Sequence, residues 1–228
     1  MSKYRNAQVF SVKQAVGLPL NQETYINNLY PCYLGVLFFG KISTPILDKL
    51  KIHIELVFDS FFFDIIFIGD KKLDTCLYNL HTKKEFNLLD RTSAKVILYP
   101  TNNFYSSIRT QMSEKKIAVG LGLTNVPIYS SSDEKLLFLF GEANLKYSCA
   151  IVSTHNLLDS NKSETVEKRI IKEAIHEIGH LILGFEHCLN DNCVMRFSAN
   201  IEKIDRKSIH LCEKCKSELK NIRTINNF

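Results

Sequence analysis

The sequence predicts an α/β fold, and three observations lead to that class. Two apolar runs rich in β-branched and aromatic residues, at 32–39 and 61–68, are bounded by Pro, Gly and Asp, as is typical of buried strands. A helical pattern of apolar residues separates them. A third strand-like run at 94–99 is again followed by a helical pattern. Because a strand, a helix and a second strand in succession favour a parallel arrangement, we expect the first two strands to form a parallel pair.

The helices that follow the first and third strands have recognisable starts. Thr44 can cap the first helix, and Pro45 suits its first position. The apolar residues of this helix recur at helical spacing: Ile46, Leu47, Leu50, Ile54, Val57 and Phe58. After Pro100, Asn102 or Asn103 can cap the second helix.

Three further apolar runs follow, at 116–124, 136–143 and 148–155. We expect each run to form a strand. The polar stretches between them are typical of surface loops, so the pattern up to this point remains that of an α/β domain.

Two helices are expected in the last third of the chain. A long helix begins near Asn161, which with Glu164 resembles a capping box, and reaches about Leu183. A last helix can start at Asp205 or Ser208 and carries two cysteines three positions apart on one face.

The composition fits one domain. With 228 residues of which 45% are hydrophobic, we expect an N-terminal arm at 1–30 and a single domain at 31–228. The net charge of +5 is small and spread along the chain, so we expect no nucleic-acid partner. No apolar run approaches the roughly 20 residues that span a bilayer, and no apolar run follows the basic residues of the first ten, so we expect no secretory signal, no membrane partner and a cytoplasmic location. We also expect a monomer.

A cluster of histidines near the end of the long helix points to a metal. His176 and His180 are four residues apart, so both imidazoles lie on one helical face, and Glu177 sits between them. Gly184 permits a left-handed turn that can bring His187 back toward the same ion. Three neutral imidazoles with one open position describe a catalytic zinc, although an HExxH pattern by itself also occurs in ordinary amphipathic helices.

Four cysteines next to this cluster have the spacing of a second metal site. They form a C-x4-C and a C-x2-C pair, which is typical of a structural four-cysteine zinc site: Cys188, Cys193, Cys212 and Cys215. His187 and Cys188 are neighbours whose side chains can point to different metals, so the second zinc would hold the third histidine in place. We expect the remaining cysteines to be buried free thiols: Cys32, Cys76 and Cys149.

These motifs together resemble those of a known family. HEIGHLILGFEHC, followed by CVM and then CEKC, resembles the archaemetzincins, whose pattern is HExxHxxGxxHC-x4-C-x-M followed by CxxC. GLGLTNVPIY and FLFGEA are similar to the stretch that precedes the helix in that family, so the resemblance covers about residues 90–218.

The resemblance implies a metzincin-like metallopeptidase fold, with a mixed sheet and an active-site helix within 31–184 and a small C-terminal lobe behind a methionine turn within 185–228. It implies two zinc ions per chain. Carried over by position, it makes Glu177 the general base and Met195 the methionine under the metal. The catalytic ligands would be His176, His180 and His187, and the structural ligands Cys188, Cys193, Cys212 and Cys215.

The chain departs from the family pattern at one place that bears on the metal. Three residues separate His180 from Gly184, where the family has two, so the helix gains about 1.5 Å and about 100° before its turn. Glu186 then stands at the family's count for the third histidine, and a carboxylate can bind zinc. We favour His187, because the order from Gly184 to Cys188 is kept, and we expect Glu186 to face solvent.

The residues and the resemblance lead to the hypothesis of a zinc metallopeptidase. Zinc bound to three histidines would activate a water, and Glu177 would accept its proton and pass it to the leaving amine. A peptide or protein substrate would bind extended beside a sheet edge, with 148–155 as the candidate strand.

Two other hypotheses remain open. The first is a non-catalytic zinc-binding or peptide-binding protein that keeps the fold but in which the extra residue misplaces His187. A weaker alternative is a zinc-ribbon contact with nucleic acid, helped by Lys207, Lys214, Lys216 and Lys220.

Overall fold

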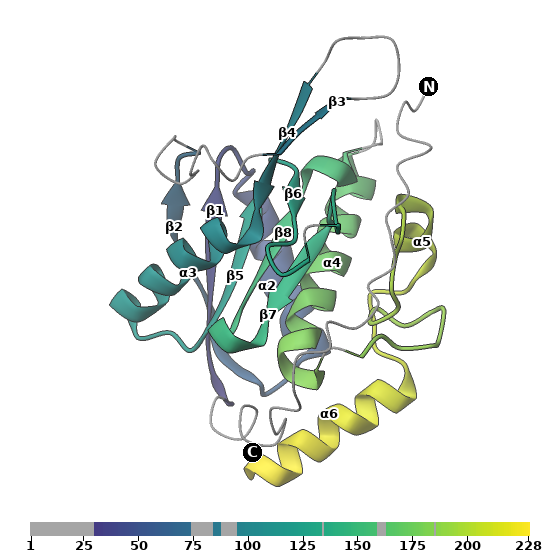
Figure 1. Cartoon of the computed structure of the whole chain (residues 1–228). Coiled ribbons are helices and arrows are strands. Elements are labelled where there is room, and N and C mark those ends of the chain that lie inside the picture. The colour runs from purple at the N-terminus through teal and green to yellow at the C-terminus, as the bar shows by residue number, and fades with distance from the viewer. Residues whose placement is uncertain (1–29, 74–83, 88–94, 134, 159–162, 185) are drawn as a thin grey trace.

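The computed structural model describes residues 30–73, 84–87, 95–133, 135–158, 163–184 and 186–228, and its centre is a five-stranded sheet in the order β2-β1-β5-β8-β7 (Figure 1). The strands are β1 (Cys32–Phe39), β2 (Phe62–Lys71), β5 (Val119–Thr124), β7 (Gly141–Asn144) and β8 (Cys149–Ser153). Neighbouring strands are parallel except β7, which runs antiparallel to β8. The sheet is therefore mixed, and the expected parallel pairing of the first two strands is confirmed. The predicted arm at 1–30 lies outside the described residues apart from Tyr30.

Helices cover both faces of this sheet. They are α2 (Pro45–Val57), α3 (Thr101–Lys115), α4 (Ser163–Leu183), α5 (Ile201–Arg206) and α6 (Glu213–Asn226). Successive side chains of a strand point to opposite faces, and β1 shows this directly. Leu34, Val36 and Phe38 pack in one core with α2 and α4, whereas Leu37 and Phe39 pack in a second core with α3. The chain thus forms three layers, with α4 on the face opposite α3 (Figure 1).

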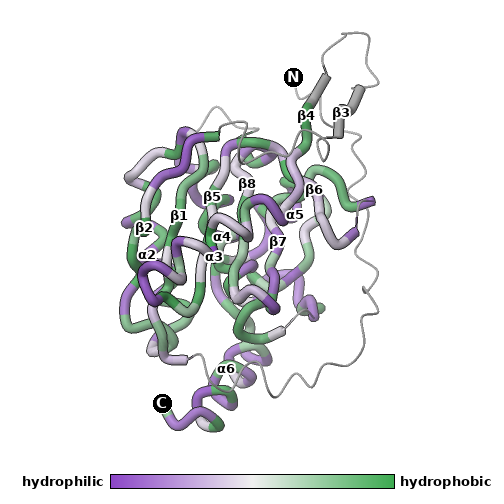
Figure 2. The backbone as a smooth tube through the Cα atoms, turned by 60° about the vertical axis from the view of Figure 1, so that its left-hand side comes forward, coloured by the Kyte–Doolittle hydropathy of each residue, from purple (hydrophilic) through white to green (hydrophobic). Residues whose placement is uncertain are grey.

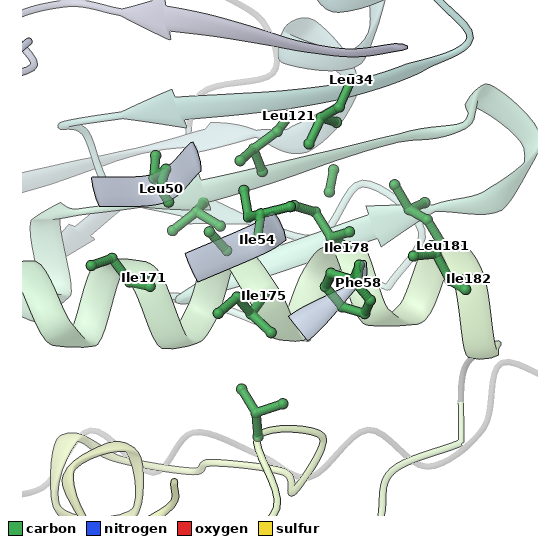
Figure 3. Close-up of a cluster of buried hydrophobic side chains, with 14 of the residues drawn as sticks. Leu34, Leu50, Ile54, Phe58, Leu121, Ile171, Ile175, Ile178, Leu181 and Ile182 are labelled. Atoms are coloured by element: carbon green, nitrogen blue, oxygen red, sulfur yellow. The ribbon is translucent and has the colours of Figure 1, made fainter. Parts of the chain in front are cut away.

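The larger core holds α4 against the sheet. In Figure 3, Leu34 and Leu121 of the sheet, Ile54 of α2, and Ile175 and Ile178 of α4 gather in one cluster. All five side chains are fully buried. The apolar side of α4 packs in this core. The polar residues of the helix, which include the histidines, lie on its other side.

The hydropathy of the residues differs between the central sheet and the outer helices. Figure 2 shows hydrophobic residues concentrated along the central strands, while α6 is hydrophilic over much of its length. Among the described helices, none is long and apolar enough to cross a bilayer.

A smaller three-stranded sheet lies beside the first. It has the order β3-β4-β6 and consists of β3 (Lys84–Asn87), β4 (Lys95–Pro100) and β6 (Ile128–Tyr129). The strand predicted at 94–99 is confirmed as β4. Neither β3 nor β6 is predicted by the sequence, because each is short and its residues lie in a polar stretch.

The predicted helix caps are only partly right. Thr44 does precede α2, but its side chain makes no capping hydrogen bond. The prediction that Asn102 or Asn103 caps α3 is wrong, because the helix begins directly after Pro100, which is extended with φ of −72° and ψ of 139°. The hydroxyl of Ser131 accepts the N–H of Asn102 at 2.9 Å, so a distant loop satisfies this helix start.

The C-terminal helices also differ from the prediction. The prediction that a last helix starts at Asp205 or Ser208 is wrong, since α5 ends at Arg206 and α6 begins after Cys212. The segment between them bonds to a neighbouring turn, and the N–H of Ser208 donates to the carbonyl of Asn192 at 3.0 Å. For α4, the predicted end at Leu183 is confirmed, while the predicted cap at 161 lies outside the described residues.

The strand predicted to lie at the sheet edge does not lie there. The run at 148–155 contains β8, which pairs with β5 on one side and β7 on the other, so it is an interior strand. The edge is β7, and of the run predicted at 136–143 only its last residues belong to that strand. A short turn at Leu145–Tyr147 reverses the chain and makes β7 the antiparallel neighbour of β8.

Candidate active site and metal centres

The two helical histidines face each other with their Nε2 nitrogens. The Nε2 atoms of His176 and His180 lie 3.1 Å apart. The other nitrogens are anchored: His176 Nδ1 lies 2.8 Å from the carbonyl oxygen of Val194, and His180 Nδ1 lies 2.9 Å from that of Gly184. A carbonyl can only accept, so both Nδ1 atoms carry the proton and both Nε2 atoms present a lone pair.

This arrangement fits a cation. Two nitrogen lone pairs that face each other repel, and a positive ion between them reverses that interaction. Burial, followed by the charge of Lys207, holds the pKa of His176 well below its usual value. Burial and then the neighbouring His187 lower the pKa of His180 to about 4. The histidines are therefore neutral near pH 7, which is the form that binds a metal.

The extra residue in the helix does not separate His187 from the other histidines. Gly184 ends the helix with φ of +92°, a conformation that favours glycine. The ring of His187 then lies 5.3 Å from that of His176 and 4.9 Å from that of His180, measured between centroids. One nitrogen from each of the three rings lies within 4.8 Å of the others. Glu186 is exposed and is not part of this group.

Glu177 is a buried carboxylate in direct contact with the edge strand. Its side chain packs on the backbone of β7 so closely that a Cβ at Gly141 would lie 2.7 Å from its Oε1. Burial raises the pKa of Glu177 well above its usual value, Glu173 and Glu142 raise it further, and Lys207 opposes them. A carboxylate with a raised pKa suits a group that takes up a proton and releases it again.

The methionine predicted to lie under the metal packs against the helix between the two histidines. Met195 is fully buried, and a Cβ at Gly179 would lie 2.2 Å from its sulfur. Only a glycine allows this approach, so the turn that contains Met195 lies against the backbone of α4 between His176 and His180.

The edge strand is held in place from the other face of the sheet. Both oxygens of the Glu142 carboxylate are engaged: Oε2 accepts the hydroxyl of Tyr105 at 2.8 Å, and Oε1 accepts the hydroxyl of Ser130. The same tyrosine hydroxyl also contacts the carbonyl of Glu142 at 3.0 Å. The backbone of β7 is therefore anchored beside Glu177, and the sequence carried no signal for these contacts.

The four clustered cysteines converge as the spacing predicts. Their sulfur atoms lie within 4.8 Å of one another, with Cys188 to Cys212 at 3.5 Å and Cys193 to Cys215 at 3.8 Å. These separations are far longer than a disulfide bond of about 2.05 Å, so the group is a set of thiols that suits a tetrahedral zinc. The predicted burial of Cys32 and Cys149 as free thiols is confirmed, and Cys76 lies outside the described residues.

The turn that contains Val194 and Met195 connects the histidine group with the cysteine group. The N–H of Cys188 donates to the carbonyl of Met195 at 2.9 Å, and the N–H of Cys212 lies 3.3 Å from the sulfur of Cys193. The cysteine group thus fixes both ends of the turn whose Val194 carbonyl orients His176.

One residue of the proposed basic surface lies elsewhere. Lys207 is fully buried and pairs with Glu173 of α4 at 2.8 Å, so it is not on an exposed face as the nucleic-acid hypothesis requires. Lys214 and Lys216 pair with acids of their own helix. A solvated helix face accounts for these two residues.

Comparison with known proteins identifies the family. A model described as peptidase family M54 matches residues 26–221. An archaemetzincin of Pyrococcus furiosus is 28% identical over 191 residues, which cover 81% of this chain and 90% of that protein. An archaemetzincin of Archaeoglobus fulgidus is 43% identical over 104 residues, which cover 46% of this chain and 61% of that protein. This match therefore spans less than two thirds of the relative's length.

A solved structure has the same architecture. The crystal structure of archaemetzincin from Methanopyrus kandleri superposes with a TM-score of 0.65 at 26% identity, and the match covers 85% of this chain and 96% of that chain. The metzincin-like fold expected from the motifs is therefore confirmed.

Proposed function

The chain belongs to peptidase family M54, and from this premise we propose that it is a zinc-dependent metallopeptidase that hydrolyses peptide bonds with Glu177 as general base. One observation carries the proposal: three histidines, each with its pKa lowered by burial, converge at the end of α4, and the residue after the first of them is a buried glutamate that rests on a sheet edge.

The two groups of side chains suit two zinc ions with different roles. The catalytic ion would be held by His176, His180 and His187, and the structural ion by Cys188, Cys193, Cys212 and Cys215. Bound to three neutral imidazoles with an open position, zinc supplies a Lewis acid and lowers the pKa of water from about 15.7 to about 7.

The chain's own groups then perform the proton transfer. Glu177 lies next to His176 on the helix and takes the proton of the attacking water, and burial, which raises the pKa of its carboxyl group, makes the carboxylate a stronger base than an exposed one. It then gives that proton to the amine that leaves. The carbonyls of Val194 and Gly184 keep the two helical imidazoles in the required tautomer throughout.

The substrate is a peptide or protein segment bound as an added strand on β7. This edge strand is anchored through Glu142 and touches Glu177 at Gly141, so a chain paired with it would pass beside the carboxylate. Among the described strands, β7 pairs only with β8, so its outer side carries no strand partner in this part of the chain.

The replacement of Glu177 tests the mechanism. Glu177→Gln keeps the size of the side chain but cannot accept the proton, so we expect two zinc ions per chain and a loss of peptide hydrolysis on the order of 10²–10⁴-fold. The assay is cleavage of a mixed peptide library followed by mass spectrometry. If the variant cleaves peptides as fast as the unmodified chain does, Glu177 is not the general base. If the unmodified, zinc-loaded chain binds peptides but cleaves none, the protein is a non-catalytic binding protein.

Zinc content tests the third ligand. His187→Ala should lower the zinc content from two ions per chain to one, and Glu186→Ala, one position away and exposed, should leave it at two. Metal analysis after gel filtration measures both. The opposite result would assign the third ligand to Glu186.

A further inference from the structure

The polar side of α4 holds the C-terminal segment through a row of charged residues. Arg169 donates to both carboxylate oxygens of Asp205, at 2.7 and 2.6 Å. Lys172, about one turn further on, donates to the carbonyls of Ile204 and Asp205 at 2.9 and 3.0 Å. These contacts anchor α5 at its C-terminal end, where a positive charge is favourable.

The next pair in the row is completely buried. Lys207 and Glu173 lie 2.8 Å apart with side chains that are 1% and 4% exposed. Two charges in such a place lose their hydration, and an apolar pair of similar volume is often at least as stable. Overall stability alone therefore does not account for a buried charged pair at this position.

Lys207 also reaches the turn that lies under the histidines. Its Nζ lies 3.4 Å from the carbonyl oxygen of Arg196, the residue after Met195. The same ammonium group thus contacts α4 and this turn. Through Glu173 it is tied to the helix one turn before His176 and Glu177.

The backbone beyond Lys207 continues this connection to the metal-binding face. The N–H of Ser208 donates to the carbonyl of Asn192 at 3.0 Å, and the N–H of Val194 donates to the carbonyl of His210 at 3.0 Å. The carbonyl of Val194 is the group that orients His176. The contacts therefore form a closed loop from α4, through Lys207 and the turn at 192–196, back to α4.

We propose that Lys207 and Glu173 are a positioning pair for the histidine site: they set the distance between α4 and the turn at 192–196, so that the carbonyl of Val194 holds His176 with Nε2 toward the metal. The proposal rests on the assignment of the histidines as metal ligands and requires no peptide hydrolysis. Loss of a contact that orients a ligand typically weakens metal binding by about 10–100-fold.

Two matched variants test the pair. Lys207→Met removes the ammonium and keeps the length of the side chain, and Lys172→Met removes an ammonium that binds the same segment without touching the turn. Cobalt(II) titration separates the two metal sites, because thiolate ligands produce an intense charge-transfer absorption that imidazole ligands do not. We expect a 10–100-fold loss of affinity at the histidine site for Lys207→Met and no loss for Lys172→Met, with the cysteine site unchanged in both.

A double variant distinguishes position from folding. Lys207→Met with Glu173→Met leaves no unpaired buried charge, so it should fold even if the single variant does not. We expect the double variant to keep the weakened histidine site and its altered cobalt spectrum. A double variant that binds cobalt as tightly as the unmodified chain, or equal losses from Lys172→Met and Lys207→Met, would overturn the proposal. All readouts are metal binding, so they are independent of whether the chain cleaves peptides.

Discussion

Gly184 offers a direct test of how the chain reaches its third histidine. It ends α4 with φ of +92°, and its carbonyl accepts the Nδ1–H of His180 at 2.9 Å. A Cβ at this position would have no heavy atom within 4 Å. Replacement by alanine therefore creates no clash, and its whole effect comes from the backbone conformation.

The magnitude follows from that conformation. Holding a residue with a Cβ in the left-handed region costs about 1–2 kcal/mol, which changes the ratio of folded to unfolded chain by about 5–30-fold. Asparagine adopts this region more readily than alanine, and a β-branched residue adopts it least. We expect the free energy of unfolding to fall in the order Gly184, Gly184→Asn, Gly184→Ala, Gly184→Val.

Urea denaturation with and without saturating zinc measures this effect. The zinc-free curves report the backbone cost. The additional stability gained on adding zinc should also shrink from Gly184→Asn to Gly184→Val, because a displaced carbonyl no longer orients His180. If Gly184→Ala is as stable as the unmodified chain, or if Gly184→Asn is no better than Gly184→Val, the turn does not require the left-handed conformation and the reasoning fails.

Three other changes have definite outcomes. Gly141→Ala should lower kcat by about 10²-fold with zinc content unchanged, since the new Cβ would lie 2.7 Å from the Glu177 carboxylate; steady-state kinetics with metal analysis checks this. Treatment with a chelator should expose the clustered cysteines to a thiol reagent, whereas Cys32 and Cys149 should stay unreactive because burial raises the pKa of each to about 12. Ile54→Ala, in the core, should lower the free energy of unfolding by about 2–5 kcal/mol, and Ile52→Ala, 62% exposed on the same helix, should change it by less than about 0.5 kcal/mol, both measured by denaturation.

Local patterns predicted the helices and central strands because their signals are contained within short windows. The apolar spacing around Leu50 gave α2, and the run at 32–39 gave β1. The pair of helical histidines was equally local, since residues four apart on a helix must share a face, as His176 and His180 do.

The errors arise where a partner distant in sequence decides the local structure. The sequence predicts Asn102 or Asn103 as the cap of α3, yet the helix begins after Pro100 and the hydroxyl of Ser131 accepts the N–H of Asn102. The last helix starts after Cys212 because the segment before it bonds to the turn at 192–194. In both cases a hydrogen bond to a segment distant in the sequence overrides the local preference. A short window of sequence does not contain that partner, so it cannot predict the bond.

The sequence by itself determined which chemistry is present: three histidines, one carboxylate and four cysteines at ligand spacings, on a chain long enough to bury them. Only the tertiary structure decided how these groups meet. It made β7 and not β8 the edge strand, brought His187 rather than Glu186 to the other histidines, and buried Lys207 against Glu173. The physical reason is that spacing limits which side chains can lie on one face of one element, whereas packing between elements determines which faces come together.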